Sequence, residues 1–191
     1  MDFVRNKLKH TLNASKGWPS PWSVDLAAEM DSAVTIDPVY AGRVAHLNTS
    51  FKLEMGVADV AMPVFLFSNS DDPDVDRSAF GSPASDEDAY VGTTPSGKLL
   101  CIPARHSCEL ESTEYDTGYT YTPDKALTAT ASNTNATTGG VLKPGSPYVE
   151  AICGVVSRGV VKSGYGPSKT ALAFWPWYMP RLSSTLKNAT T

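Results

Sequence analysis

The chain of 191 residues is poor in the residue types that build most metal, redox and catalytic sites, with three cysteines and three histidines. Charged residues make up 19% of it, below the average of about 25% for globular domains. Its formal net charge of −4 offers no strongly basic surface, which binding to nucleic acid normally requires. We therefore expect no nucleic-acid partner.

Long hydrophobic runs are also missing. No stretch approaches the length of a membrane span, and residues 1–12 lack the apolar core of a secretory signal. Cys101, Cys108 and Cys153 cannot all pair within one chain. The four Asn-x-Ser/Thr triplets agree with chance in an Asn/Thr-rich sequence. We expect a soluble protein with reduced thiols, made in a cytoplasm and without a membrane partner.

What the sequence does contain is a series of short apolar segments separated by turn residues, typical of a β protein. Much of the sequence that is not apolar consists of Ser, Thr, Asn and Gly, which favour turns. Pro63 interrupts one expected strand, which indicates an edge or a bulge there. The segments expected to form strands are 39–47, 57–67, 99–102, 109–115, 119–122, 149–161 and 170–175, with turns at 116–118 and 139–140. The fold class predicted is all-β: a single barrel or sandwich of short antiparallel strands.

The most apolar part is the last third, Ile152–Val161 followed by Leu172–Pro180. Three of the last six residues of the second segment are aromatic and two are proline, which excludes a helix. We expect this unit to be buried, either in this chain or against a partner. Trp175 ends a predicted strand, so we expect it in the core.

Composition along the chain predicts three parts. Residues 1–33 form an extended N-terminal arm, within which residues 1–12 have the apolar spacing of a short helix. Residues 34–180 form the β-rich globular domain, and residues 181–191 form a flexible tail.

Aromatic residues are the strongest indication of a binding surface. Tryptophan and tyrosine are enriched at interface hot spots because they bury a large, rigid area. An arm that carries two tryptophans with two prolines between them is expected to lie on a neighbouring surface. The predicted partner-binding residues are Trp18, Pro19, Pro21, Trp22, Trp177 and Tyr178.

The acidic cluster Asp71, Asp72, Asp74 and Asp76 matches the calcium loop of an EF-hand only in part. Starting the loop at Asp72 puts Arg77 where glycine is needed and Pro83 where a bidentate glutamate is needed. A solvated acidic loop explains the cluster better, with a weak cation site of another kind as the open alternative.

A zinc site would draw on Cys101, His106, Cys108 and the distant Cys153, but their spacing lacks the short ligand pairs of structural zinc sites. Buried free thiols explain Cys101 and Cys153, which lie in apolar segments. We expect no metal and no cofactor.

No pattern predicts catalysis, and we expect no enzyme. The glycine before Ser157 is one residue too far away for a Gly-x-Ser-x-Gly elbow. Neither His46 nor His106 lies in a nucleophile motif. Glu109 and Glu111 alternate along one strand and share a face, which we interpret as a solvated outer face.

A pattern of strands and turns spans about residues 35–180. Its most distinctive segments are Tyr40–Val44, Ala61–Phe67 with Asp72–Val75, Glu109–Tyr115, Gly154–Gly159 and Leu172–Pro180. These segments resemble those of small structural proteins of tailed bacteriophages, above all the capsid decoration (cement) proteins.

The resemblance implies a β-rich, non-enzymatic virion protein on the outer surface of an icosahedral capsid, assembled in the host cytoplasm. Such proteins clamp subunits of the major capsid protein, often as homotrimers and frequently through an extended arm. The major capsid protein and further copies of the chain are therefore the expected partners. The alternatives are a head-tail connector or tail-associated structural protein and, less favoured, a small β-barrel hydrolase or a carbohydrate-binding module with aromatics on one exposed platform.

Overall fold

A computed structural model describes residues 12–16, 26–29, 31, 39–40, 42–59, 61–69, 90–92, 98–104, 109–130, 139–162 and 170–182. These residues contain thirteen strands and no helix. None of them therefore belongs to a helix with the length and hydropathy needed to cross a bilayer. The all-β prediction is confirmed.

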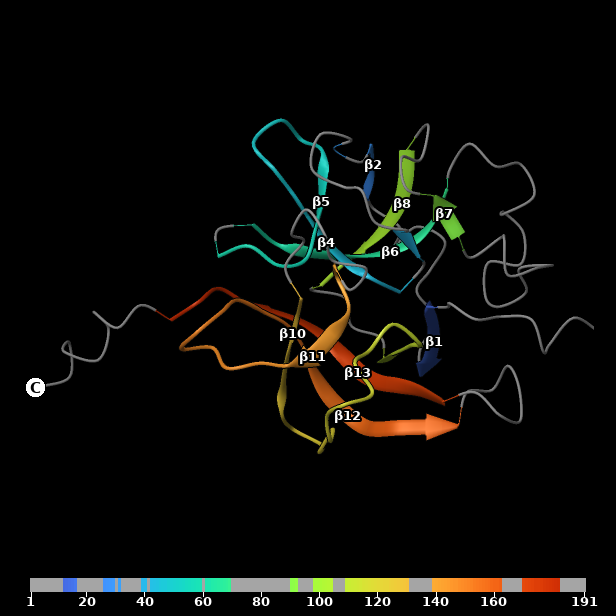
Figure 1. Cartoon of the computed structure of the whole chain (residues 1–191), viewed down its shortest axis with the longest axis vertical. Coiled ribbons are helices and arrows are strands. Elements are labelled where there is room, and N and C mark those ends of the chain that lie inside the picture. Colours follow the sequence, from blue (N-terminus) through green and yellow to red (C-terminus); the bar gives the residue numbers. More distant parts are fainter. Residues whose placement is uncertain are drawn as a thin grey trace, which may run out of the picture.

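Six strands form the first sheet, which we name sheet A (Figure 1). Neighbouring strands in it are all antiparallel. In spatial order they are β1 (Leu12–Lys16), β9 (Glu109–Ser112), β13 (Thr170–Met179), β12 (Ile152–Lys162), β10 (Ala126–Ala129) and β11 (Leu142–Pro144).

Five strands form sheet B, which is also antiparallel. In spatial order they are β2 (Leu26–Glu29), β8 (Lys98–Pro103), β6 (Pro63–Asn69), β4 (Val44–Leu47) and β5 (Leu53–Met55). A separate pair consists of β3 (Val39–Tyr40) and β7 (Tyr90–Gly92).

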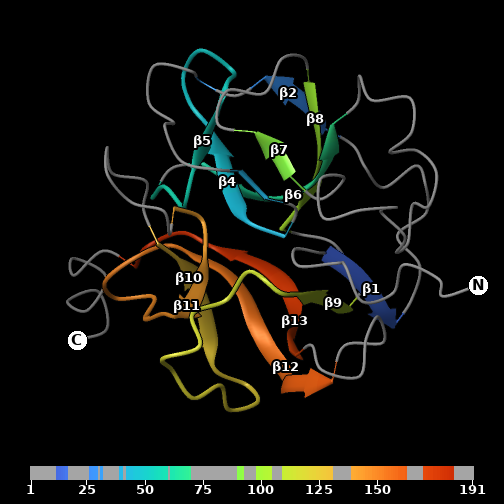
Figure 2. The ribbon, with the colours of Figure 1, turned by 45° about the vertical axis from the view of Figure 1, so that its right-hand side comes forward.

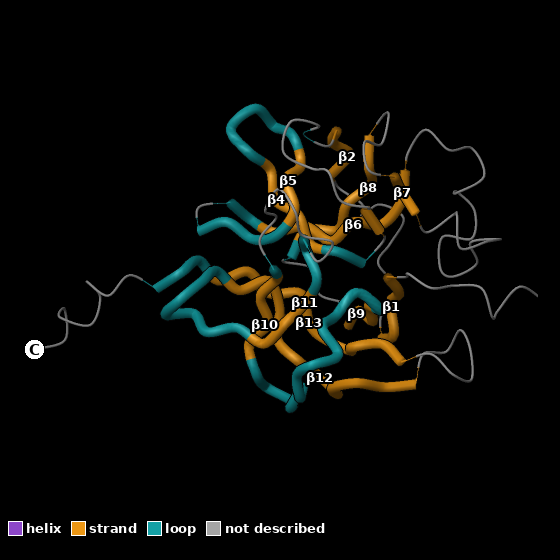
Figure 3. Tube along the Cα trace, viewed as in Figure 1, coloured by secondary structure: helices purple, strands orange, loops and turns teal. Residues whose placement is uncertain are grey.

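The two sheets lie as two layers, with sheet B above sheet A in Figures 2 and 3. One hydrophobic core joins them, and in it Phe65 of β6 meets Phe174 of β13 with ring centroids 5.0 Å apart. Of the two architectures predicted, the structure is therefore the sandwich. The remaining buried members of this core are Val44, Ile102, Ala104, Leu110, Tyr121, Leu127, Ala129, Leu142, Cys153, Val156 and Leu172.

Sheet B is buried on its other face as well. Val64 and Leu66 alternate with Phe65 along β6, so they point away from sheet A, and both are buried. A strand covered on both faces needs a continuous apolar run rather than an alternating one, and β6 has one. The buried residues of this second cluster are Ala28, Ala45, Leu53, Met55, Val64, Leu66 and Cys101.

Two segments of the range predicted as an arm are edge strands of the sandwich. β1 pairs with β9 at one edge of sheet A, and Leu12 lies opposite Ser112. β2 pairs with β8 at one edge of sheet B, where Leu26 lies opposite Cys101. The N-terminal part of the chain thus supplies an edge strand to each sheet.

Two local predictions are wrong. Pro63 does not mark an edge, because β6 lies inside sheet B between β8 and β4. Proline is tolerated there as the first residue of the strand, and the pairing irregularity lies further on, between Leu66 and Ser68. Residues 119–122 form no strand, although the turn before them is present: Gly118 N donates to Asp116 Oδ1 over 2.8 Å.

Candidate functional site

Strand β13 exposes two tryptophans. Trp175 is 39% exposed and Trp177 is 57% exposed. Phe174, just before them, and Pro176, between them, are buried. Successive side chains of a strand point to opposite faces, so both indoles lie on the outer face of sheet A. The prediction of a core position for Trp175 is therefore wrong, because Phe174 takes the inward position at this point of the strand.

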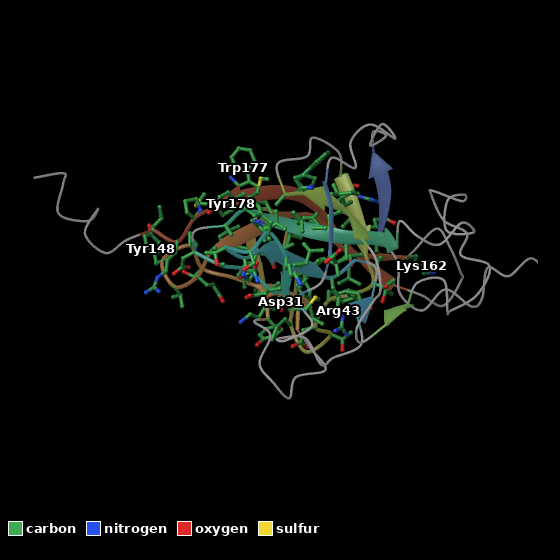
Figure 4. All side chains as sticks on the ribbon, turned by 90° about the horizontal axis from the view of Figure 1, so that it is seen from above. Asp31, Arg43, Tyr148, Lys162, Trp177 and Tyr178 are labelled. Carbon is green, nitrogen blue, oxygen red and sulfur yellow. The ribbon has the colours of Figure 1, made fainter. Side chains whose placement is uncertain are left out.

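Tyr178, predicted together with Trp177 as a partner contact, points the other way. Its ring packs partly against the core between the sheets, and its hydroxyl donates to Asp59 O over 3.4 Å. Figure 4 shows Trp177 projecting away from the ribbon and Tyr178 lying closer to it. Tyr178 thus fixes the end of β13, while Trp177 remains accessible.

The other predicted contacts, Trp18, Pro19, Pro21 and Trp22, lie outside the described residues.

A network of charged groups lies across the same sheet. Glu109 of β9 accepts hydrogen bonds from Ser157 Oγ (2.6 Å to Oε2) and from Arg158 Nε (3.0 Å to Oε1). Arg158 Nη2 also lies 2.7 Å from Glu109 Oε1 and 2.7 Å from Glu111 Oε1. Since β13 runs between β9 and β12, these side chains pass over it, at the level where the small Ala173 pairs with Glu111.

These carboxylates are buried, contrary to the prediction of a solvated face. Glu109 is 1% exposed and Glu111 is also buried, while the Arg158 side chain is 40% exposed. Hydrogen bonds to Glu109 raise the pKa of Arg158, so the cation is held in place over both carboxylates. A buried carboxylate pair requires such a partner, because an uncompensated buried charge is strongly destabilising.

A bulge in β12 places Ser157 and Arg158 there. Val156 pairs with Phe174 and Gly159 pairs with Ala173, so the two residues between them have no partner on β13. Gly159 has a φ of 77°, and a Cβ at this position would lie 2.8 Å from Tyr121 O. Only glycine fits this conformation and this close approach. A glycine after two polar residues in an otherwise apolar strand was the sequence signal for this bulge.

The network lies on the same face of sheet A as the exposed indoles. The register of β9 and β13 puts Leu110 opposite Phe174, so the next residue, Trp175, lies beside Glu109. Both carboxylates bind Arg158 and are shielded from solvent. The outer face of sheet A therefore presents Trp175 and Trp177 on a fixed base; we call this the tryptophan face.

A second buried ion pair joins the two layers. Arg43, just before β4, donates through Nε to Glu114 Oε2 over 2.8 Å, and both side chains are almost fully buried. Nearby, Ser112 Oγ donates to Gly42 O over 3.0 Å. These contacts fix sheet A on sheet B, and hence the orientation of the tryptophan face; Figure 4 shows the place of Arg43.

Within the described part of the chain, no three His, Cys, Asp or Glu side chains are arranged to hold a metal ion. Cys101 and Cys153 are buried thiols outside any disulfide, as predicted, and burial raises the pKa of Cys101 to about 12. His46 Nδ1 lies 3.1 Å from the backbone oxygen of Gly56. Among the hydrogen bonds of the described residues, none joins His46 to a cysteine or a serine. The cluster Asp71–Asp76, His106 and Cys108 lie outside those residues.

No protein-family model, curated protein or solved structure gives a significant match to this chain.

Proposed function

We propose that the chain is a virion structural protein that binds the outer surface of an icosahedral phage capsid. In this proposal it stabilises the shell by bridging subunits of the major capsid protein. The observation that carries the proposal is the tryptophan face, on which Trp175 and Trp177 lie exposed over a rigid, ion-paired sheet. The resemblance of the strand and turn pattern to capsid decoration proteins supports it further.

The energetic reason is that exposed indoles on a rigid base are efficient hot spots. They bury large area on binding and lose little conformational freedom. A protein that binds the mature shell lattice but not its free subunits stabilises that lattice by mass action. Many copies around a closed shell then multiply a modest gain at each site. Self-association, as a homotrimer, would further place several tryptophan faces against adjacent capsid subunits.

The test is co-sedimentation of the purified chain with capsids of its own virus from which the protein has been removed. We expect Trp177→Ala to weaken binding by about thirtyfold, which corresponds to about 2 kcal/mol for an aromatic hot spot. Trp175→Ala should act in the same direction. The matched control is Phe51→Ala, because Phe51 is 80% exposed but lies in the β4–β5 hairpin of sheet B.

Wild-type protein that fails to sediment with these capsids would contradict the proposal. Capsid binding that survives both tryptophan substitutions would contradict the assignment of the tryptophan face. Circular dichroism of each variant separates lost binding from lost folding.

A further inference from the structure

An open pocket of about 460 Å³ lies beside β11, away from the contacts described so far. This volume falls within the range of about 300–1,000 Å³ that is usual for small-ligand sites. Three segments form it: the turn after β9, the residue after β10, and β11 with the residue before it. The lining residues are Tyr115, Asp116, Thr117, Tyr119, Thr130, Val141 and Lys143.

Backbone pairing brings these segments together. Tyr115 forms an isolated parallel bridge with Leu142, and Asp116 N donates to Leu142 O over 2.8 Å. On the other side, Thr130 N donates to Val141 O over 3.0 Å. The pocket is therefore built into the sheet edge and does not depend on side-chain packing alone.

Contacts behind the lining residues hold the walls in place. Tyr121 O–H donates to Asp116 O (2.8 Å) and Leu142 O (3.1 Å). Its ring meets Tyr115 edge-on, with centroids 5.5 Å apart. The Tyr115 hydroxyl in turn lies 2.7 Å from Thr170 Oγ1. A site fixed in this way loses little entropy when a ligand binds.

The groups that face the pocket define the chemistry of its ligand. Tyr119 is exposed and offers a ring face, and Asp116 offers a carboxylate of which Oδ1 is already bound to Gly118 N. Lys143 offers an ammonium group, 3.5 Å from Glu150 Oε2. Thr117 and Thr130 add hydroxyls.

Charge and shape together select among ligands. One carboxylate and one lysine, itself paired with Glu150, give the site no net positive charge, which disfavours anions. A ring face beside several hydrogen-bonding groups suits a molecule with one apolar C–H face and a rim of hydroxyls. A neutral sugar has this form.

We infer that the pocket framed by Tyr119, Asp116 and Lys143 binds a neutral carbohydrate. The ligand stacks one face of a sugar ring on Tyr119, donates a hydroxyl to Asp116 and accepts from Lys143. This site is independent of the tryptophan face, so it adds glycan binding to the proposed capsid role and does not rest on that role.

The test is saturation-transfer NMR on the full chain with four neutral disaccharides: maltose, cellobiose, lactose and N,N′-diacetylchitobiose. We expect at least one to receive saturation, strongest on the protons of one ring face. Tyr119→Ala should abolish the transfer, and Asp116→Asn should weaken binding by about tenfold, as for loss of a hydrogen bond to a charged group. Asn at position 116 keeps an oxygen for the Gly118 N–H, so the turn is preserved.

Tyr148→Ala is the matched control, since Tyr148 is an exposed tyrosine that does not line the pocket. The inference is overturned if none of the four sugars receives saturation from folded wild-type protein. It is also overturned if Tyr119→Ala binds as wild type does, or if inorganic phosphate displaces the sugar. Capsid co-sedimentation of Tyr119→Ala should be unchanged, which keeps the failure of one proposal distinct from failure of the other.

Discussion

Arg158 of β12 binds Glu109 of β9 across the full width of β13, with Nη2 2.7 Å from Oε1. β9 and β12 are thereby joined by side chains, in addition to the backbone ladders that each forms with β13. This ion pair lies on the face of sheet A that exposes Trp175, and Trp175 lies beside Glu109, whose charge Arg158 neutralises. Local charge pairing and the proposed binding surface are therefore parts of one arrangement.

Removal of the Arg158 guanidinium should destabilise the fold. Arg158→Ala removes the guanidinium that contacts two buried carboxylates, and we expect a loss of about 2 kcal/mol in the free energy of unfolding. This is less than the 3–5 kcal/mol of fully buried pairs because solvent screens a half-exposed arginine. Urea unfolding measures this loss.

Arg181→Ala is the control, because Arg181 and Asp59 lie 3.6 Å apart and are both about half exposed. This substitution should cost well under about 1 kcal/mol in the free energy of unfolding. Equal losses for the two variants would contradict the account.

The Arg43–Glu114 pair should show strong coupling. Arg43→Met leaves the Glu114 carboxylate buried without its arginine, at an expected cost of about 3–5 kcal/mol. The double variant Arg43→Met/Glu114→Leu removes both charges, so it should recover most of that loss. A double-mutant cycle by urea denaturation gives the coupling energy. Simple addition of the two single losses would show that the pair does not hold the layers together.

Phe51 is placed at a backbone position that disfavours it. It has a φ of 59°, which costs a side chain with a Cβ roughly 1–2 kcal/mol. Phe51→Asn and Phe51→Gly should therefore stabilise the protein, by about 0.5–1 kcal/mol, since Phe51 is 80% exposed and contributes little packing. Thermal and urea unfolding of both variants check this. Destabilisation by both would mean that the ring is needed for the hairpin.

Stability should fall in alkali through the buried thiols. Burial raises the pKa of Cys101 from its ordinary value of 9.0 to about 12. The contribution of this thiol is fully present below about pH 9, where the unfolded chain is also protonated. It is lost as the pH rises towards 12, because the unfolded chain then ionises first.

The measurement is the free energy of unfolding from about pH 8 to about pH 11, compared with a Cys101→Val variant of similar volume. We expect the wild type to lose up to about 1.4 kcal/mol per pH unit more than the variant above pH 9. If the free energy of unfolding falls equally with pH in the wild type and in Cys101→Val, the thiol ionises as readily in the folded chain as in the unfolded chain, which would contradict this prediction. A Cys108→Ser background removes the cysteine that lies outside the described residues.

The sequence predicted the strands better than it predicted the site. The β12–β13 unit follows from its apolar run and its prolines, and the turn at Gly139–Gly140 follows from its glycines. Alternation along β9 correctly put Glu109 and Glu111 on one face but wrongly made that face solvated. The partner that buries them lies 47–49 residues later in the chain, and a local pattern cannot show it.

The error at Trp175 has a similar origin. A pattern shows that every second residue of β13 points inward but leaves open which set does so, and Phe174 packing on Phe65 decides it. The pocket beside Tyr119 was missed because its walls come from three separate segments joined by the parallel bridge between Tyr115 and Leu142. Such convergence depends on the tertiary fold.

The measurement that most directly tests the central claim is the number of copies of this chain per purified particle of the virus that encodes it. Quantitative mass spectrometry against the major capsid protein gives the ratio. Binding over the whole capsid surface predicts a ratio near one to one. A few copies per particle would place the chain at the portal or tail, and its absence from the particles would contradict a virion role altogether.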